Sequence, residues 1–88
     1  MHEWVKTFKL LGNDRRLRIL KLLTKYPELS VKDIAKKLDL SAKRTSHCLV
    51  MLSHADLVLG KGKLGSVYYA LHPKLKTEVQ YILKKFIV

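Results

Sequence analysis

The chain has 88 residues, 48% of them hydrophobic, which is enough for one domain with a single modest core and argues against a disordered chain. Eighteen Lys and Arg residues against seven Asp and Glu give a formal net charge of +11, which favours a polyanionic partner, nucleic acid before membrane. No apolar run approaches the roughly 20 residues of a membrane-spanning helix, and the first residues lack the pattern of a signal peptide. A charge that only keeps a small protein soluble is the alternative interpretation.

The first part of the chain predicts two amphipathic helices. The apolar side chains of residues 2–11 share one helical stripe, which consists of Trp4, Val5, Phe8 and Leu11. After a glycine-asparagine break, Asp14 is expected to cap a second helix over residues 15–25. The apolar side of this second helix consists of Leu17, Ile19, Leu20, Leu22 and Leu23. Pro27 then ends the helical run.

Two further helices are predicted over residues 31–38 and 42–54, and each follows a serine. Ser30 and Ser41 are expected to be N-caps, because a serine hydroxyl accepts a hydrogen bond from an otherwise unpaired backbone N–H of the first turn. Only two residues separate the first helix from the second cap, so the helices must meet at a steep angle. This is the layout of a helix-turn-helix.

A hairpin, called the wing below, is predicted over residues 57–71. Residues 57–59 and 67–71 are rich in residues that favour strands. The segment between them, residues 60–65, is a glycine-rich loop that carries Lys61 and Lys63. The wing therefore presents two positive charges on a loop able to approach another backbone closely.

The last predicted element is a helix over residues 73–88, with Pro73 in its first turn. Its apolar residues at helical spacing are Leu75, Val79, Ile82, Leu83, Phe86 and Ile87. The predicted order is α-α-α-α-β-β-α, a mainly α fold with a small β-hairpin. Residues 1–88 are thus expected to form one winged helix-turn-helix domain, made up of the helix-turn-helix at 30–54, the wing at 57–71 and terminal helices at 2–11 and 73–88.

The helix predicted over residues 42–54 has the pattern of a recognition helix. At about 100° per residue, its buried face centres on Thr45, with Leu49 and Leu52 beside it and Cys48 at the edge. The residues predicted to contact DNA from this helix and its cap are Ser41, Lys43, Arg44, Ser46, His47 and Val50. Lysine or arginine can donate to guanine O6 and N7, and valine can touch a thymine methyl group. An ordinary solvated face is the alternative.

The wing lysines, Lys61 and Lys63, are predicted to contact DNA as well. They can neutralise backbone phosphates or probe the minor groove. The alternative is a charged hairpin tip that only discourages pairing with another strand.

Four segments of the chain resemble ArsR-type (arsenical-repressor-like) winged-helix regulators. The most specific is 8–23, which resembles the opening segment of that family. Residues 40–52 resemble its recognition helix, 55–58 resemble the exit from that helix, and 65–71 resemble its second wing strand. The resemblance covers nearly the whole chain.

This resemblance implies a transcriptional repressor that binds double-stranded DNA as a homodimer. It also implies that the first and last helices form the dimer interface. The apolar residues expected there are Trp4, Val5, Phe8, Val79, Ile82, Leu83, Phe86 and Ile87. They supply more apolar surface than a core of this size can easily cover, which independently favours a dimer.

The chain departs from the family at its metal ligands. Residues 29–34 contain no cysteine, and the last helix contains no histidine and only one acid, Glu78. His47 and His54 share a face but lie about 10.5 Å apart along a helix, too far for one ion. We therefore expect no metal site and no cofactor. Cys48 replaces the histidine usual in the family's recognition helix and is expected to be a small buried hydrophobe, with a redox switch as the alternative.

Neither a glycine-rich phosphate loop nor a catalytic triad or carboxylate pair is present in the sequence, so the chain is not expected to be an enzyme. The single cysteine fits a reducing, cytoplasmic setting. Two other functions stay open beside the DNA-binding repressor. One is a winged-helix module that binds RNA, and the other is a protein-interaction module with a merely solvated basic face.

Overall fold

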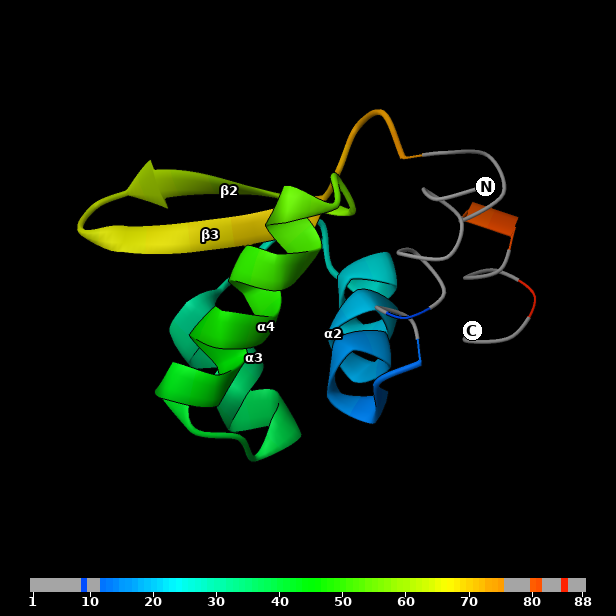
Figure 1. Ribbon diagram of the computed structural model, residues 1–88. Helices are drawn as coiled ribbons and strands as arrows, with labels where there is room; N and C mark the ends of the chain where they lie inside the picture. The colour runs from blue at the N-terminus through cyan, green and yellow to red at the C-terminus, as the bar shows by residue number, and fades with distance from the viewer. Residues whose placement is uncertain (1–8, 10–11, 76–79, 82–84, 86–88) are drawn as a thin grey trace.

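The computed structural model describes residues 9, 12–75, 80–81 and 85. The elements in this part of the chain follow the order α2 (Asp14–Lys25), β1 (Leu29–Ser30), α3 (Val31–Leu38), α4 (Ala42–His54), β2 (Val58–Lys63) and β3 (Ser66–Leu71). The wing, formed by β2 and β3, projects beyond the helices (Figure 1). The winged helix-turn-helix fold is therefore confirmed, but the described residues follow the order α-β-α-α-β-β and do not match the predicted order α-α-α-α-β-β-α. The interface residues predicted on the first and last helices lie outside the described residues.

The two serine N-caps of the helix-turn-helix are confirmed. Ser30 Oγ accepts a hydrogen bond from the backbone N–H of Asp33 at 3.1 Å, at the start of α3. Ser41 Oγ accepts one from the backbone N–H of Arg44, also at 3.1 Å, at the start of α4. Both helices begin and end at the predicted residues because these caps are local signals.

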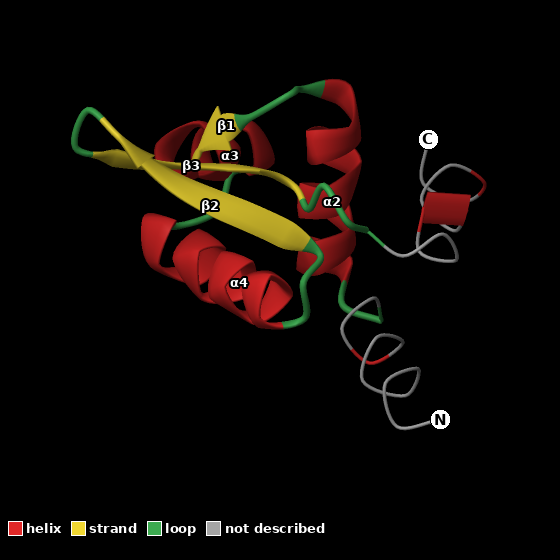
Figure 2. Cartoon of the chain, turned by 90° about the horizontal axis from the view of Figure 1, so that it is seen from above, coloured by secondary structure: helices red, strands yellow, loops and turns green. Residues whose placement is uncertain are grey.

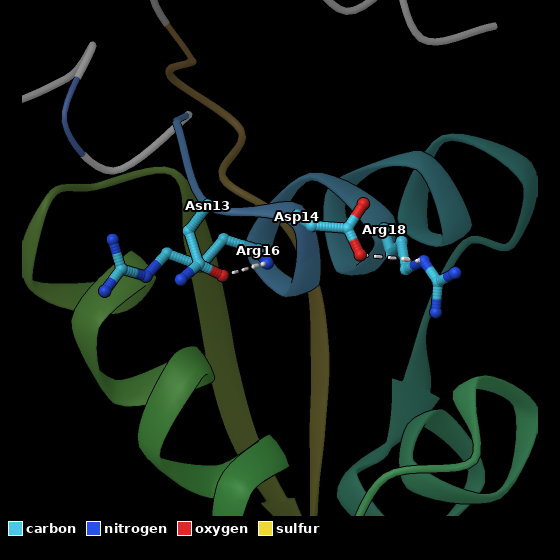
Figure 3. Close-up of polar contacts among 4 residues, drawn as sticks. All are labelled: Asn13, Asp14, Arg16 and Arg18. Atoms are coloured by element: carbon cyan, nitrogen blue, oxygen red, sulfur yellow. Dashed lines mark hydrogen bonds and ion pairs between the residues drawn. The ribbon is translucent and has the colours of Figure 1, made fainter.

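The predicted cap of α2 is wrong by one residue. Asn13, not Asp14, is the N-cap, and its Oδ1 accepts a hydrogen bond from the backbone N–H of Arg16 at 3.2 Å. Asparagine caps a helix as well as aspartate does. Asp14 instead lies in the first turn of α2, where the helix dipole stabilises a negative charge. Its Oδ2 lies 3.3 Å from Arg18 Nε and forms an ion pair with it (Figure 3).

The sheet has three strands, not the predicted two. Its order is β1-β3-β2, and both pairings are antiparallel. In β1, Leu29 pairs with Tyr69 and Ser30 with Tyr68, and Figure 2 shows this short strand beside β3. A strand of two residues is too short to show an alternating pattern, which explains why the sequence did not reveal it.

Strand β2 is longer than predicted and reaches Lys63. The glycine-rich segment therefore belongs mostly to the strand, and only Leu64 and Gly65 form the turn. Their φ angles are 47° and 80°, as in the two-residue turns whose twist matches that of a hairpin. Leu64 is fully exposed at the tip of the wing.

One core joins α2, α3, α4 and the base of the sheet. Its largest fully buried apolar residues are Ile19, Leu20, Ile34, Leu49, Leu52 and Val58. The predicted inner face of α4 is confirmed, since Thr45, Cys48, Leu49 and Leu52 are its buried residues. Thr45 Oγ1 donates to the backbone carbonyl of Ser41 at 2.9 Å, so this buried hydroxyl is satisfied.

A helix was predicted to begin at Pro73, but the chain forms a turn there, directly after β3. Pro73 and Lys74 lie in a turn, in which the backbone N–H of Leu75 donates to the carbonyl of His72 at 3.0 Å. The fixed φ of proline suits a turn as well as a first helical turn. None of the described helices combines the length and apolar character needed to cross a membrane.

Candidate nucleic-acid interface

The outer face of α4 exposes every residue that the sequence predicts for DNA contact from this helix. Those residues are Ser41, Lys43, Arg44, Ser46, His47 and Val50. Their exposure follows from the burial of the opposite face, which anchors α4 on the core. Polar and basic side chains on a well-packed helix are the arrangement that reads base edges in a major groove.

A groove of about 550 Å³ lies between the start of α2 and the first half of α4. This basic groove is lined by Asn13, Arg15, Arg16, Ser41, Lys43, Arg44, His47 and Cys48. Every charged side chain in this lining is basic. A second hollow of about 420 Å³ adjoins it and is lined by Asn13, Asp14, Arg15, Arg18 and Leu40.

Arg15 and Arg16 of α2 also line this groove, and the sequence analysis did not include them among the candidate site residues. Both arginines lie in the first turn of α2, where positive charge is unfavourable. This misplaced charge is the signal that could have revealed them. Arg16 connects the two helices, since its Nη2 lies 3.4 Å from Met51 Sδ on α4. Figure 3 shows Arg16 and Arg18 pointing to opposite sides of α2.

The wing lysines lie on strand β2 and not in the loop where they were predicted. Lys61 pairs in register with Tyr68 and Lys63 with Ser66, so both lysines lie on one face of the hairpin. Their surroundings differ. Lys63 Nζ lies 2.6 Å from Glu28 Oε1 and 5.6 Å from the centroid of the Tyr68 ring. Lys61 makes no ion pair within the described residues.

The two glycines inside β2 also have different surroundings. A Cβ at Gly60 would lie 2.8 Å from Tyr69 Cε1 and 2.9 Å from Tyr69 Cζ, so the ring packs directly on the glycine backbone. A Cβ at Gly62 would have no heavy atom within 4 Å. Gly60 is therefore required for packing at the base of the wing, whereas the fold has no steric need for Gly62.

Metal binding has no support among the residues described. No group of three or more His, Cys, Asp or Glu side chains in that part of the chain is placed to hold a metal ion. Cys48 is buried, as expected for a small hydrophobe.

Comparison with known proteins identifies relatives over most of the chain. Residues 13–59 match the family described as "Bacterial regulatory protein, arsR family". The chain is 35% identical to the arsenic resistance transcriptional regulator ArsR1 of Pseudomonas putida, over 88% of this chain and 60% of that protein. It is 34% identical to the arsenical resistance operon repressor of Escherichia coli, over 81% of this chain and 61% of that protein. The chain thus spans about 60% of the length of these relatives.

Two solved structures share the fold closely. HlyU from Vibrio cholerae has a TM-score of 0.82 and 32% identity, over 94% of this chain and 86% of that chain. The homodimeric winged helix-turn-helix DNA-binding domain Mb0332 from Mycobacterium bovis has a TM-score of 0.82 and 25% identity. That match covers 94% of this chain and 76% of the other.

Proposed function

Because the chain belongs to the arsR family of bacterial regulatory proteins, we propose that it is a homodimeric repressor that binds specific sites in double-stranded DNA. The observation that supports this most directly is the exposed face of α4 beside a groove whose charged lining is entirely basic. Its relatives are named as transcriptional regulators. We propose that the chain has no catalytic activity and that it works in the cytoplasm, where its DNA would lie.

In this proposal α4 reads bases and the wing contacts the backbone. Lys43, Arg44 and His47 lie on the exposed side of α4, where they can donate to base edges in the major groove. Lys61 and Lys63 lie on one face of β2 and contribute positive charge that a phosphate attracts.

The dimer is proposed from the sequence and from one relative. The apolar residues predicted for the interface lie outside the described residues, and Mb0332 is a homodimer. Sedimentation at micromolar concentration should show a dimer, and Phe86→Asp should produce a monomer that binds DNA more weakly. A wild-type monomer at that concentration would contradict the dimer.

Selection of bound sequences from random duplex DNA at near-physiological salt tests the function itself. We expect a preferred site with two related halves, because a two-fold dimer reads a site of matching symmetry. If the dimer neutralises about 8 phosphates, the slope of log Kobs against log salt should be near −7. Stronger binding to structured RNA than to any duplex would favour an RNA-binding module. The absence of salt-sensitive binding would favour a protein-interaction module.

We also propose that arsenite, zinc and cadmium do not release this protein from DNA. The family resemblance implies cysteine ligands within the segment 29–34, and this segment contains no cysteine. Titration of each ion into a preformed complex checks this, and release by one equivalent of ion per site would contradict it.

A further inference from the structure

The three arginines near the start of α2 differ in their contacts with other side chains of the protein. Arg18 pairs with Asp14 at 3.3 Å. Arg16 is half-buried and reaches across to Met51 on α4. Arg15 is exposed, lines both the basic groove and the adjoining hollow, and has no ion pair with any described residue. Arg15 is therefore the arginine of this turn whose charge is available to a partner.

The position of Arg15 is unfavourable without an anion. It lies in the first turn of α2, where the helix dipole disfavours positive charge. It also shares the basic groove with Lys43 and Arg44, and like charges in one groove repel one another. A bound anion would relieve both effects, and a planar guanidinium suits the oxygen atoms of a phosphate.

We propose that Arg15 binds a phosphate of the DNA backbone beside the bases that α4 reads. This inference rests on the proposed function and adds a third DNA-contacting element, α2, to the recognition helix and the wing. The strand would pass over the basic groove, so that α2 and α4 hold it from two sides. A phosphate contact fixes the position of the protein on the duplex and carries no base information, so Arg15 acts on every sequence alike.

Two variants on the same helix test the proposal. Arg15→Gln removes a positive charge from the groove, and Lys21→Gln removes the same charge from an exposed position of α2 that lines neither hollow. Affinity is measured at several salt concentrations, on the selected site and on a scrambled duplex. Arg15→Gln should weaken binding to both duplexes by about tenfold and flatten the salt slope by about 2, for one phosphate in each half of the dimer. Lys21→Gln should leave the slope unchanged.

Two further measurements, with the variant Arg15→Lys and with inorganic phosphate, separate a DNA phosphate contact from other roles of Arg15. Arg15→Lys should restore the slope with part of the affinity, since it keeps the charge without the paired donors. If inorganic phosphate at constant ionic strength binds wild-type protein but not Arg15→Gln, and does not weaken wild-type binding to DNA, the groove is a site for a free anion and the proposal is wrong. Equal slopes for Arg15→Gln, Lys21→Gln and wild type would also overturn it. Failure of the wild type to bind duplex DNA would overturn the proposed function as well.

Discussion

Helix α4 and the wing carry similar numbers of positive charges, but one of the two wing lysines already has an acidic partner. Lys43 and Arg44 line a groove in which all charged side chains are basic. Lys63 already has Glu28 at 2.6 Å and the Tyr68 ring at 5.6 Å. We therefore expect a lysine of the proposed DNA-binding surface to contribute to binding only as far as its neighbours leave it unpaired.

The two regions also differ in how firmly they are held. Four side chains of α4 are buried in the core, whereas the wing is exposed from Lys61 to Val67. A side chain must be held in place to discriminate bases, while a phosphate contact tolerates more movement. We therefore expect changes in α4 to alter which sequence is bound, and changes in the wing to alter how tightly any sequence is bound.

Among substitutions in α4 and the wing, Lys43→Ala should have the largest effect. Loss of a good base contact reduces discrimination at that base by about 1–3 kcal/mol, or roughly 5- to 150-fold. Binding to single-base variants of the selected site measures this. Lys36→Ala, an exposed lysine of α3, is the control and should leave base preference unchanged. A uniform loss across all sequences would show that Lys43 contacts only the backbone.

Gly60→Ala should destabilise the wing and Gly62→Ala should not. The new methyl at Gly60 would overlap the Tyr69 ring, so we expect a loss of about 1–3 kcal/mol in the free energy of unfolding. At Gly62 the methyl has open space, and replacing glycine in a strand should stabilise by up to about 1 kcal/mol. Urea denaturation of both variants measures the difference. Equal stabilities would mean that Tyr69 moves aside at no cost.

Lys61→Ala should weaken DNA binding more than Lys63→Ala. Removing Lys61 should flatten the salt slope by about 2 per dimer, and removing Lys63 should flatten it by less, because Glu28 already neutralises part of its charge. Glu28→Gln should free Lys63 and tighten binding a few-fold at low salt. In that background Lys63→Ala should cost as much as Lys61→Ala. If Glu28→Gln has no effect, the ion pair opens freely when DNA binds, as exposed pairs often do.

Asp56→Gly, in the connection between α4 and β2, should have the smallest effect. Asp56 has a φ of 58°, so it adopts the left-handed conformation just past the end of α4. Glycine adopts this conformation without strain, so the variant should be more stable by up to about 1 kcal/mol. A thermal melt measures the shift. A lower midpoint would indicate that the Asp56 carboxylate makes a stabilising contact in solution.

Features that depend on neighbouring residues in the sequence were predicted more fully than contacts between residues far apart in the sequence. The limits of α3 and α4 follow from Ser30, Ser41 and the apolar spacing between them, all within a few residues. The pairing of Glu28 with Lys63 spans 35 residues and leaves no pattern in the sequence. The basic groove likewise joins Arg15 to α4 across the fold, so neither its shape nor the proposed role of α2 could be predicted from the spacing of apolar residues.

Ser30 belongs to two elements at once, and this couples the wing to the helix-turn-helix. It is the last residue of β1, paired with Tyr68, and its hydroxyl caps α3 through Asp33. Breaking the strand pairing would also disturb the cap, so both should open in one cooperative event. Amide hydrogen exchange should therefore give Asp33 and the paired amides of β1 and β3 one common opening free energy, while the amides near Leu64 exchange by separate, easier fraying.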